Sequence, residues 1–343
     1  MLVALAGACL LLTISLALST FGSVWSEYDF RALDFFFRRA VAHGFGPKQS
    51  PQIVLVTITD ATYNSLGRTS LDRGYMADVN DALSSLDIEA LGYDLIFSRA
   101  GDADSDARFE RSLRRMGSVY LPIGLGFSEN ASSFRWEDGQ SFKRLRSEYI
   151  RKPVEAGTGK PFYATRALMQ CDIFSEASRS SGHISALSDS DGVYRHMIML
   201  LKVGDACFPT LSLSMFLDYA RVPFEKVLVE WGRRIVIPAG GESFLEKDVV
   251  IPIDERGCAY VPFPGEWDRT FKKMEVSSLL QRMDDRNLRG NLTDFFEGRF
   301  ILLGDVSTGS ADLGHTPLES DTPLILLHAS MLNGMLTNEF YAK

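Results

Sequence analysis

The chain has 343 residues, of which 45% are hydrophobic and 23% are charged, a composition typical of globular proteins and not of disordered ones. The formal net charge of -8 and the lack of Lys/Arg runs argue against nucleic-acid binding. The cysteines show no Cys-x-x-Cys spacing, so we expect neither a zinc motif nor a redox motif, and no cofactor. If the body of the protein is exported, Cys171, Cys207 and Cys258 allow at most one disulfide, and three buried thiols are the favoured alternative.

The first 25 residues predict a membrane anchor. They contain no Asp, Glu, Lys or Arg, and the first charged side chain is Glu27. A helix of roughly twenty apolar residues crosses a bilayer, and this segment supplies them. A cleaved signal peptide is the alternative, but it would have a basic start and a shorter apolar core, although Ala17-Leu18-Ser19 resembles a cleavage site. We therefore expect an uncleaved transmembrane anchor at residues 1–25.

The next segment, residues 27–46, predicts an amphipathic helix that leaves the membrane. Gly44, Gly46 and Pro47 would end it. Apolar residues recur along the segment at helical spacing, at Phe30, Leu33, Phe37 and Val41.

Strands and helices then alternate. Segments 53–58, 90–97 and 119–125 have the composition of buried strands, and segments 73–86 and 105–116 have helical periodicity. This β-α-β-α-β order predicts a parallel sheet with right-handed crossovers. We therefore expect an α/β fold in which helices flank a mostly parallel sheet.

The second half of the chain predicts an inserted β-rich region and a return to the sheet. Ser188–Gly192 has the chemistry of a turn, in which Asp189, Asp191 and Gly192 lie between two short strands and precede Arg195. The apolar run 300–303 is typical of a strand buried on both faces, so we expect it to join the sheet of strand 53–58. The remaining predicted elements are helices at 162–170, 210–220, 276–288 and 324–337 and strands at 234–237, 249–251 and 259–262.

Strand 300–303 opens into a Gly-, Ser- and Thr-rich loop, which is how open α/β sheets present binding crevices at their carboxyl ends. On pattern alone, a simple surface turn is favoured over a crevice. Acidic residues nevertheless follow or interrupt several predicted strands, and parallel strands end at the same edge. The predicted crevice consists of Asp60, Asp94, Gly304, Asp312 and Thr316, together with Arg73 as a partner for a carboxylate or an anionic ligand.

An alternative function for the same residues is a structural salt-bridge network between Arg73 and the acids, with no ligand at all. The chain contains no Gly-x-Ser-x-Gly elbow, no His-Glu-x-x-His motif and no phosphate-binding loop, and its five histidines are scattered. The sequence therefore predicts no catalytic residue and no metal site.

Four motifs in register resemble a known family, the CHASE domain of type 2, which is an extracellular sensory domain associated with nucleotide cyclases and histidine kinases. Together they cover roughly residues 27–338. In chain order they are IVLVTITDATYNSLG followed by Arg73, then ALGYDLIF, then GHISALSDSDGVYRHMIML with Asp189, Asp191, Gly192 and Arg195, and finally FILLGDVSTGSADLGHTPL followed by His328-Ala329.

The sequence departs from the family pattern at three places. Thr59 replaces the first of two usual acids, segment 68–72 lacks the usual tryptophan and proline, and Leu324 follows Pro323 where a glycine is usual. If these residues shape a ligand pocket, the ligand of this member differs or its binding is lost.

The resemblance implies one anchor helix, a large sensor domain on the outer face of a bacterial inner membrane, further membrane helices and a cytoplasmic cyclase or kinase output. The output part is not in this sequence. We expect an unknown small-molecule or protein signal, and a homodimer formed through the membrane-proximal helices. The alternatives are a periplasmic metal-dependent hydrolase that uses Asp60, Asp94 and Asp312, and a structural or assembly protein with the same fold.

Overall fold

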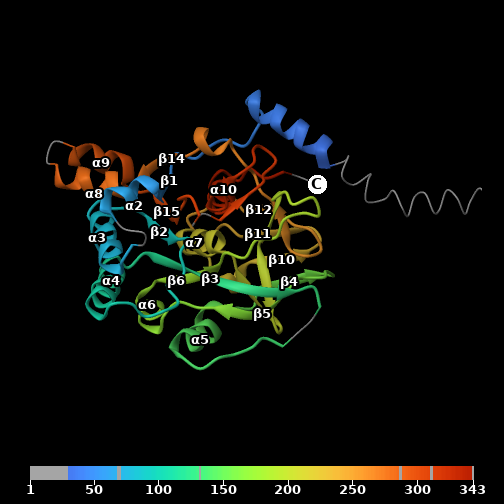
Figure 1. Ribbon diagram of the computed structural model, residues 1–343. Helices are drawn as coiled ribbons and strands as arrows, with labels where there is room; N and C mark the ends of the chain where they lie inside the picture. Colours follow the sequence, from blue (N-terminus) through green and yellow to red (C-terminus); the bar gives the residue numbers. More distant parts are fainter. Residues whose placement is uncertain (1–29, 68–70, 131–132, 286–287, 310–311, 342–343) are drawn as a thin grey trace, which may run out of the picture.

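Parallel strands form the centre of the fold in the computed structural model of the chain (Figure 1). Every neighbouring pair in this part of the sheet is parallel, and β15 lies between β1 and β2 with Val54 opposite Ile301. The prediction that four distant segments share one mostly parallel sheet is therefore confirmed. The order across the sheet is β14 (Lys272–Glu275), β1 (Ile53–Ile58), β15 (Phe300–Asp305), β2 (Ala90–Tyr93) and β3 (Val119–Ser128).

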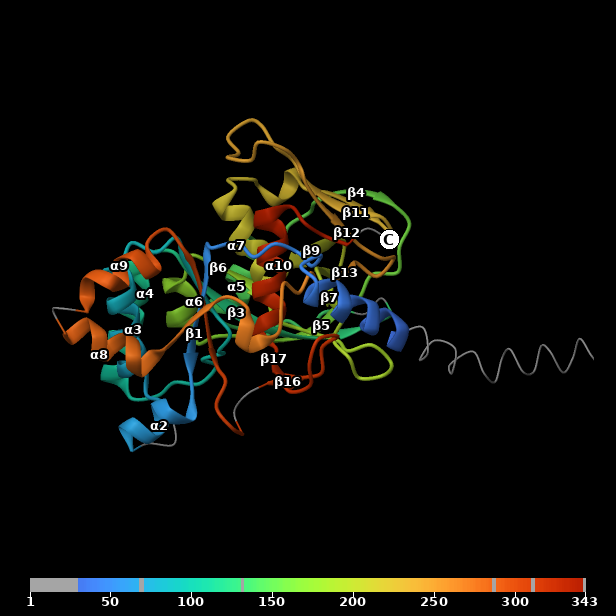
Figure 2. The same ribbon diagram turned by 90° about the horizontal axis from the view of Figure 1, so that it is seen from above.

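Helices cover both faces of this sheet, which explains the continuous apolar runs of its strands. In β1, Ile53 and Leu55 belong to one core cluster, while Val54 and Val56 belong to the cluster on the other face. The covering helices are α3 (Arg73–Ser84), α4 (Ala103–Met116), α8 (Val276–Asp284) and α9 (Arg289–Phe296) on one face, and α7 (Leu211–Tyr219) and α10 (Ile325–Thr337) on the other (Figures 1 and 2).

A β-rich region is inserted after β3, as predicted. It extends the main sheet beyond β3 and adds a second, four-stranded sheet in the order β12, β11, β10, β4. Its strands are β4 (Val154–Gly157), β5 (Tyr163–Leu168), β6 (Ser180–His183), β7 (His196–Ile198), β8 (Leu200–Val203), β9 (Ala206–Pro209), β10 (Leu228–Trp231), β11 (Arg234–Ile237), β12 (Val249–Pro252) and β13 (Cys258–Tyr260). The smaller elements of the chain are α2 (Asp60–Leu66), α5 (Gln140–Arg144), α6 (Asp172–Ala177), β16 (Leu313–Gly314) and β17 (Thr322–Pro323).

Three predicted elements differ from the structure. The prediction of a helix at 162–170 is wrong. This segment contains strand β5, which pairs antiparallel with the carboxyl-terminal half of β3. β2 ends at Tyr93, so Asp94 follows the strand instead of lying inside it. The helix predicted at 276–288 ends at Asp284, and α9 begins at Arg289. In the first case, pairing with an available neighbouring strand overrides the weak local helical pattern.

The structure describes residues 30–67, 71–130, 133–285, 288–309 and 312–341. The predicted anchor at 1–25 and Cys9 lie outside these residues. Within these ranges, no helix has both the length and the apolar character needed to cross a membrane. Cys171 and Cys207 are free thiols.

The amino-terminal helix, residues 30–42, lies against the body of the domain beside β7 and close to the carboxyl-terminal segment (Figure 2). The ring of Phe37 is 5.2 Å from the ring of Tyr341 and 6.5 Å from that of Phe263. The segment between this helix and β1 also contacts α10, since Ser50 N–H donates to Asn333 Oδ1 over 2.7 Å. The two ends of the described chain therefore meet on one side of the fold.

Candidate functional site

Arg195 is the most deeply buried charged residue described, with 1% of its surface exposed. Backbone hydrogen bonds from Gly192 N–H to Asp189 O and from Asp189 N–H to Val193 O close the turn that precedes it. Gly192 has a φ of 83°, which glycine adopts without strain. The turn therefore brings Asp189 and Asp191 back toward the guanidinium of Arg195.

The guanidinium of Arg195 contacts three carboxylates. Its Nε and Nη2 donate to the two oxygens of Asp34 over 2.8 and 2.7 Å, a bidentate pair. Nη1 donates to Asp189 over 3.0 Å, and both Nη1 and Nη2 donate to Asp191 over 2.9 and 2.8 Å. We call these four residues the Arg195 cluster. The ring of Phe30 lies 4.5 Å from the guanidinium, and His196 Nδ1 lies 2.8 Å from Asp189 Oδ1.

The electrostatics of the cluster favour the charged forms of Arg195 and Asp191. Burial alone would lower the pKa of Arg195, but the hydrogen bonds to Asp191, Asp34 and Asp189 outweigh burial and raise it. The hydrogen bond from Arg195 lowers the pKa of Asp191 below its usual value. One cation with three carboxylates leaves a net charge of about -2 at neutral pH.

The cluster fixes the amino-terminal helix, because Asp34 belongs to that helix whereas the other three residues belong to the body of the domain. A second polar contact holds the same helix, since Arg38 Nε donates to Pro317 O over 2.5 Å. Any displacement of helix 30–42 relative to the body would break these contacts.

The carboxyl ends of β1, β2 and β15 lie at one edge of the parallel sheet, and four of the predicted residues follow or end these strands or lie in the segment after β15. The carboxylate of Asp60 accepts from Thr308 N–H over 3.1 Å and from Thr308 Oγ1 over 2.7 Å. A Cβ atom on Gly304 would lie 3.5 Å from Cβ of Asp94, and Asp312 is close enough to Asp94 to act on its charge. We call Asp60, Asp94, Gly304 and Asp312 the carboxyl-edge set.

Asp94 is the perturbed acid of this set. Burial raises its pKa to about 7, and the negative charge of Asp312 adds to the effect. Near neutral pH both its protonated and its ionised form are populated, so it can either donate or accept a hydrogen bond.

Arg73 and Thr316 lie outside the carboxyl-edge set. Arg73 pairs with Asp106 over 2.9 Å and stacks 5.2 Å from the centre of the Phe174 ring, so its ionic partner is none of the predicted acids. Thr316 is buried, and its hydroxyl donates to Glu319 O over 3.1 Å within its own turn. Both positions stabilise local structure.

A short segment connects the two polar regions. Asp312 lies near Asp94 at one end, and its carbonyl accepts from Leu324 N–H at the start of α10. Further along, Tyr194 N–H donates to His315 O over 2.7 Å, next to Arg195 in the chain. At the other end, Pro317 accepts from Arg38. Segment 312–317 thus runs from the carboxyl edge to the amino-terminal helix.

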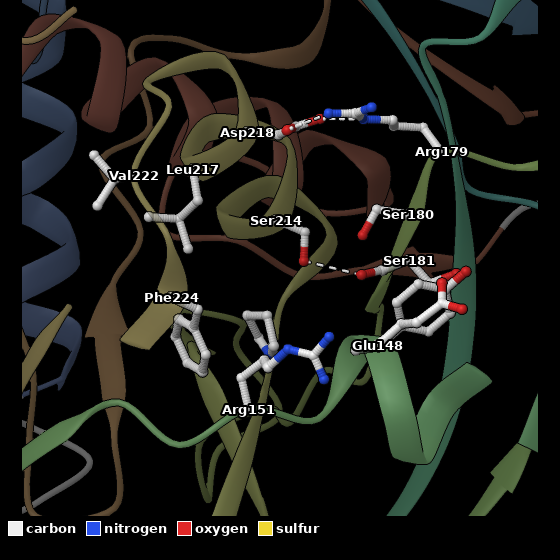
Figure 3. A pocket seen from close by; sticks show the side chains of 12 residues that line it. Glu148, Arg151, Arg179, Ser180, Ser181, Ser214, Leu217, Asp218, Val222 and Phe224 are labelled. Carbon is white, nitrogen blue, oxygen red and sulfur yellow. Dashed lines mark hydrogen bonds and ion pairs between the residues drawn. The ribbon is translucent and has the colours of Figure 1, made fainter. Parts of the chain in front are cut away.

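A pocket of about 280 Å³ opens near the start of β6, at the edge of the fold where the parallel strands begin (Figure 3). Arg179 and Asp218 form a bidentate pair over 2.8 and 2.9 Å, and Ser214 Oγ donates to Ser181 O over 3.0 Å. The hydrogen bond from Arg179 lowers the pKa of Asp218. Because these polar groups are bonded to one another, the pocket presents little unpaired charge to a ligand.

The sequence prediction missed Asp34. The residue lies on the apolar stripe of the amino-terminal helix, three positions before Phe37 and four after Phe30. A lone carboxylate on a buried helix face requires a cationic partner, and this requirement is the feature of the sequence that could have identified Asp34 as a site residue. It does not identify the partner, which lies 161 positions away. Among the residues that the structure describes, no three His, Cys, Asp or Glu side chains are grouped so that they could hold a metal ion.

Comparison with protein families matches the CHASE2 domain to residues 7–343. Comparison with curated proteins and with solved structures gave no match.

Proposed function

Because the chain belongs to the CHASE2 family of sensory, non-catalytic domains, we propose that it senses an extracytoplasmic signal for a bacterial membrane-bound transducer and relays it through helix 30–42. The observation that carries this proposal is the Arg195 cluster, in which the body of the domain holds Asp34 of the helix that follows the apolar segment 1–25. The output is a nucleotide cyclase or a kinase on the cytoplasmic side.

The relay requires two arrangements of the helix against the body. A signal shifts the balance between them only by the difference between its affinities for the two. In the docked arrangement, Asp34 and Arg38 are both bonded, and Phe37 packs on the carboxyl-terminal segment. In the released arrangement, Arg195 keeps Asp189 and Asp191, so release removes one of its three carboxylates and leaves no buried unpaired charge.

Segment 312–317 supports a role for the carboxyl-edge set as a ligand site. A ligand that contacts Asp94 or Asp312 would displace the segment whose other end holds Arg38. Asp312→Ala separates ligand binding from a structural role. If Asp312 binds the signal, the variant loses the response with the fold intact. If its role is structural, the variant lowers the melting temperature of the domain.

Exposed aromatic rings on helix 30–42 support a homodimer formed through this helix. Phe36 is 67% exposed and Phe35 is 59% exposed, whereas the next residue, Phe37, packs against the core. Aromatic side chains left in water at this density are typical of interaction surfaces. A second copy of the helix would bury them.

The proposal is tested in the full-length membrane protein by measuring its cyclase or kinase output. Asp34→Asn should change the basal output several-fold, because it weakens the contact that selects the docked helix. The matched control is Asp218→Asn, which weakens the pair with Arg179 and leaves the Arg195 cluster unchanged. If both variants change the output equally, or if neither does, the relay through the Arg195 cluster is wrong.

A further inference from the structure

Two histidines are buried between the main sheet and the carboxyl-terminal helix. His183 is the last residue of β6 and is 0% exposed, and His328 lies in α10 and is 4% exposed. Helix α7 packs against both β6 and α10 (Figure 2). A positive charge on His328 would lower the pKa of His183, so the two rings are near enough to interact. We call them the histidine pair.

The surroundings of the histidine pair do not stabilise a bound proton. Neither ring nitrogen of His183 has a hydrogen-bond partner among the residues that the structure describes, and Nδ1 of His328 likewise has none. The ring of His183 lies 6.1 Å from the ring of Phe208 instead. A buried imidazolium without an acceptor is unfavourable, and burial accordingly lowers the pKa of both histidines to about 3. Both rings are therefore neutral while they are packed.

The charged groups of the neighbouring elements do not change this result. The elements that pack most closely are β3, β9, α7 and segment 145–149 against β6, and α7, β1, β12 and β15 against α10. Apart from the burial of the rings, the only effect on either pKa is that of His328 on His183. No described carboxylate therefore holds a proton on the pair. The charged or titratable residues of these elements are Tyr120, Arg146, Glu148, Tyr149, Cys207, Asp218, Tyr219 and Asp305.

Helix α10 also holds the segment that follows the amino-terminal helix. Asn333 of α10 is 0% exposed, and its Oδ1 accepts from Ser50 N–H over 2.7 Å. Its Nδ2 donates to Lys48 O over 2.9 Å. An outward displacement of α10 would break these contacts and loosen the connection between helix 30–42 and β1.

We propose that the histidine pair is an acid-sensitive switch: acidification on the extracytoplasmic side releases α10 from α7 and the main sheet, because the released histidines bind protons and the packed ones do not. The inference rests on the proposed sensory function and deepens it, since the proton becomes a signal that reaches helix 30–42. An exposed histidine has a pKa of about 6.5, so the packing of α10 is fully stable above this pH and weakens as pH falls toward 3.

Hydrogen exchange of the purified full chain in detergent, followed by mass spectrometry, measures the opening of α10 once the intrinsic pH dependence of exchange is corrected for. From pH 7 to pH 5, the equilibrium constant for opening should rise about 25-fold for each histidine that becomes exposed. Helices α3 and α4 are the internal control, because they contribute to the opposite core cluster and no histidine lies within residues 44–182. Their protection should change little over the same range.

Variants assign the effect to the histidine pair. His328→Leu and His183→Phe remove the titrating groups, and apolar replacements are suitable because three of the four ring nitrogens have no partner. Each variant should keep the protection of α10 at pH 7 and reduce its loss at pH 5 about 25-fold. The control is His43→Gln, which changes an exposed histidine and should behave like the wild type. Asp94 acts on stability in the opposite direction, but its contribution is common to all these proteins and cancels in the comparison.

Three results would overturn the inference: unchanged protection of α10 in the wild type between pH 7 and pH 5, an equal loss of protection in α3 and α10, or the same pH dependence in the wild type and both histidine variants. The first two are measured on the wild type alone, so they decide the question even if a variant does not fold.

The exchange measurement is independent of the output assay with Asp34→Asn. If that variant changes the output while the protection of α10 does not depend on pH, the relay stands and the switch is wrong. If the protection depends on pH as expected and Asp34→Asn has no effect, the switch stands and the relay through the Arg195 cluster is wrong.

Discussion

Replacement of Arg195 by methionine tests how much the Arg195 cluster contributes to the free energy of unfolding. Methionine keeps much of the side-chain length and removes the charge, so three carboxylates remain together with no cation. Arg195 is 1% exposed and its partner Asp34 12% exposed, so solvent screens their interaction little. Removing one partner of a buried ion pair typically costs about 3–5 kcal/mol, and we expect Arg195→Met to lower the free energy of unfolding by that amount.

The pH dependence gives a second, independent signature. Arg195 lowers the pKa of Asp191, so this pair stabilises the fold above the ordinary pKa of Asp, about 3.9, and the stabilisation is lost as pH falls through the lowered value. In Arg195→Met the same carboxylates repel one another until they are protonated. The difference in stability between wild type and variant should therefore be largest near pH 7 and should shrink below about pH 4.

The assay is urea unfolding of the full chain in detergent at pH 7 and at about pH 3, below the ordinary pKa of Asp, and it reads the midpoint and slope of the transition. Lys152→Met is the control, because Lys152 pairs with Asp205 at the surface, where the two side chains are 66% and 85% exposed. Surface pairs of this kind contribute roughly 0–1 kcal/mol. If Arg195→Met costs no more than Lys152→Met, or if its cost does not decrease in acid, the cluster does not hold the helix as argued.

Three further predictions concern the carboxyl edge, the topology and the dimer. Burial raises the pKa of Asp94 to about 7, so the contribution of this residue to stability is fully present below the ordinary Asp pKa and is lost as pH rises through 7. Asp94→Asn should therefore stabilise the protein by about 1–3 kcal/mol at pH 8 and change its stability little near pH 4. Equal effects at the two pH values would contradict the raised pKa. Cysteines introduced at the exposed residues Asp104 and Glu242 should react with a membrane-impermeant maleimide in intact cells, and reaction only after lysis would disprove the extracytoplasmic placement. Phe36→Cys should form a disulfide-linked dimer under mild oxidation in membranes, whereas Asp104→Cys, on α4, should not; equal crosslinking of the two would remove the support for a helix-mediated dimer.

The four central strands could be predicted from the sequence because each is a short apolar run, and a strand buried on both faces needs no particular neighbour to be recognised. The position of Asp94 beside Gly304 followed from the same pattern, since parallel strands end at one edge. The motifs that resemble CHASE2 also indicated the family that the comparison matched.

Only the tertiary structure decided which side chains pair. The local pattern identified the turn before Arg195 and the helix that carries Asp34, but their contact joins residues far apart in the chain. Arg73 likewise pairs with Asp106 instead of the expected acids, and segment 163–168 becomes a strand because β3 offers it a partner. Local patterns record burial and backbone preference, which are properties of neighbouring residues. The partner of a buried charge depends on how separate elements pack, and periodicity in the sequence does not contain that information.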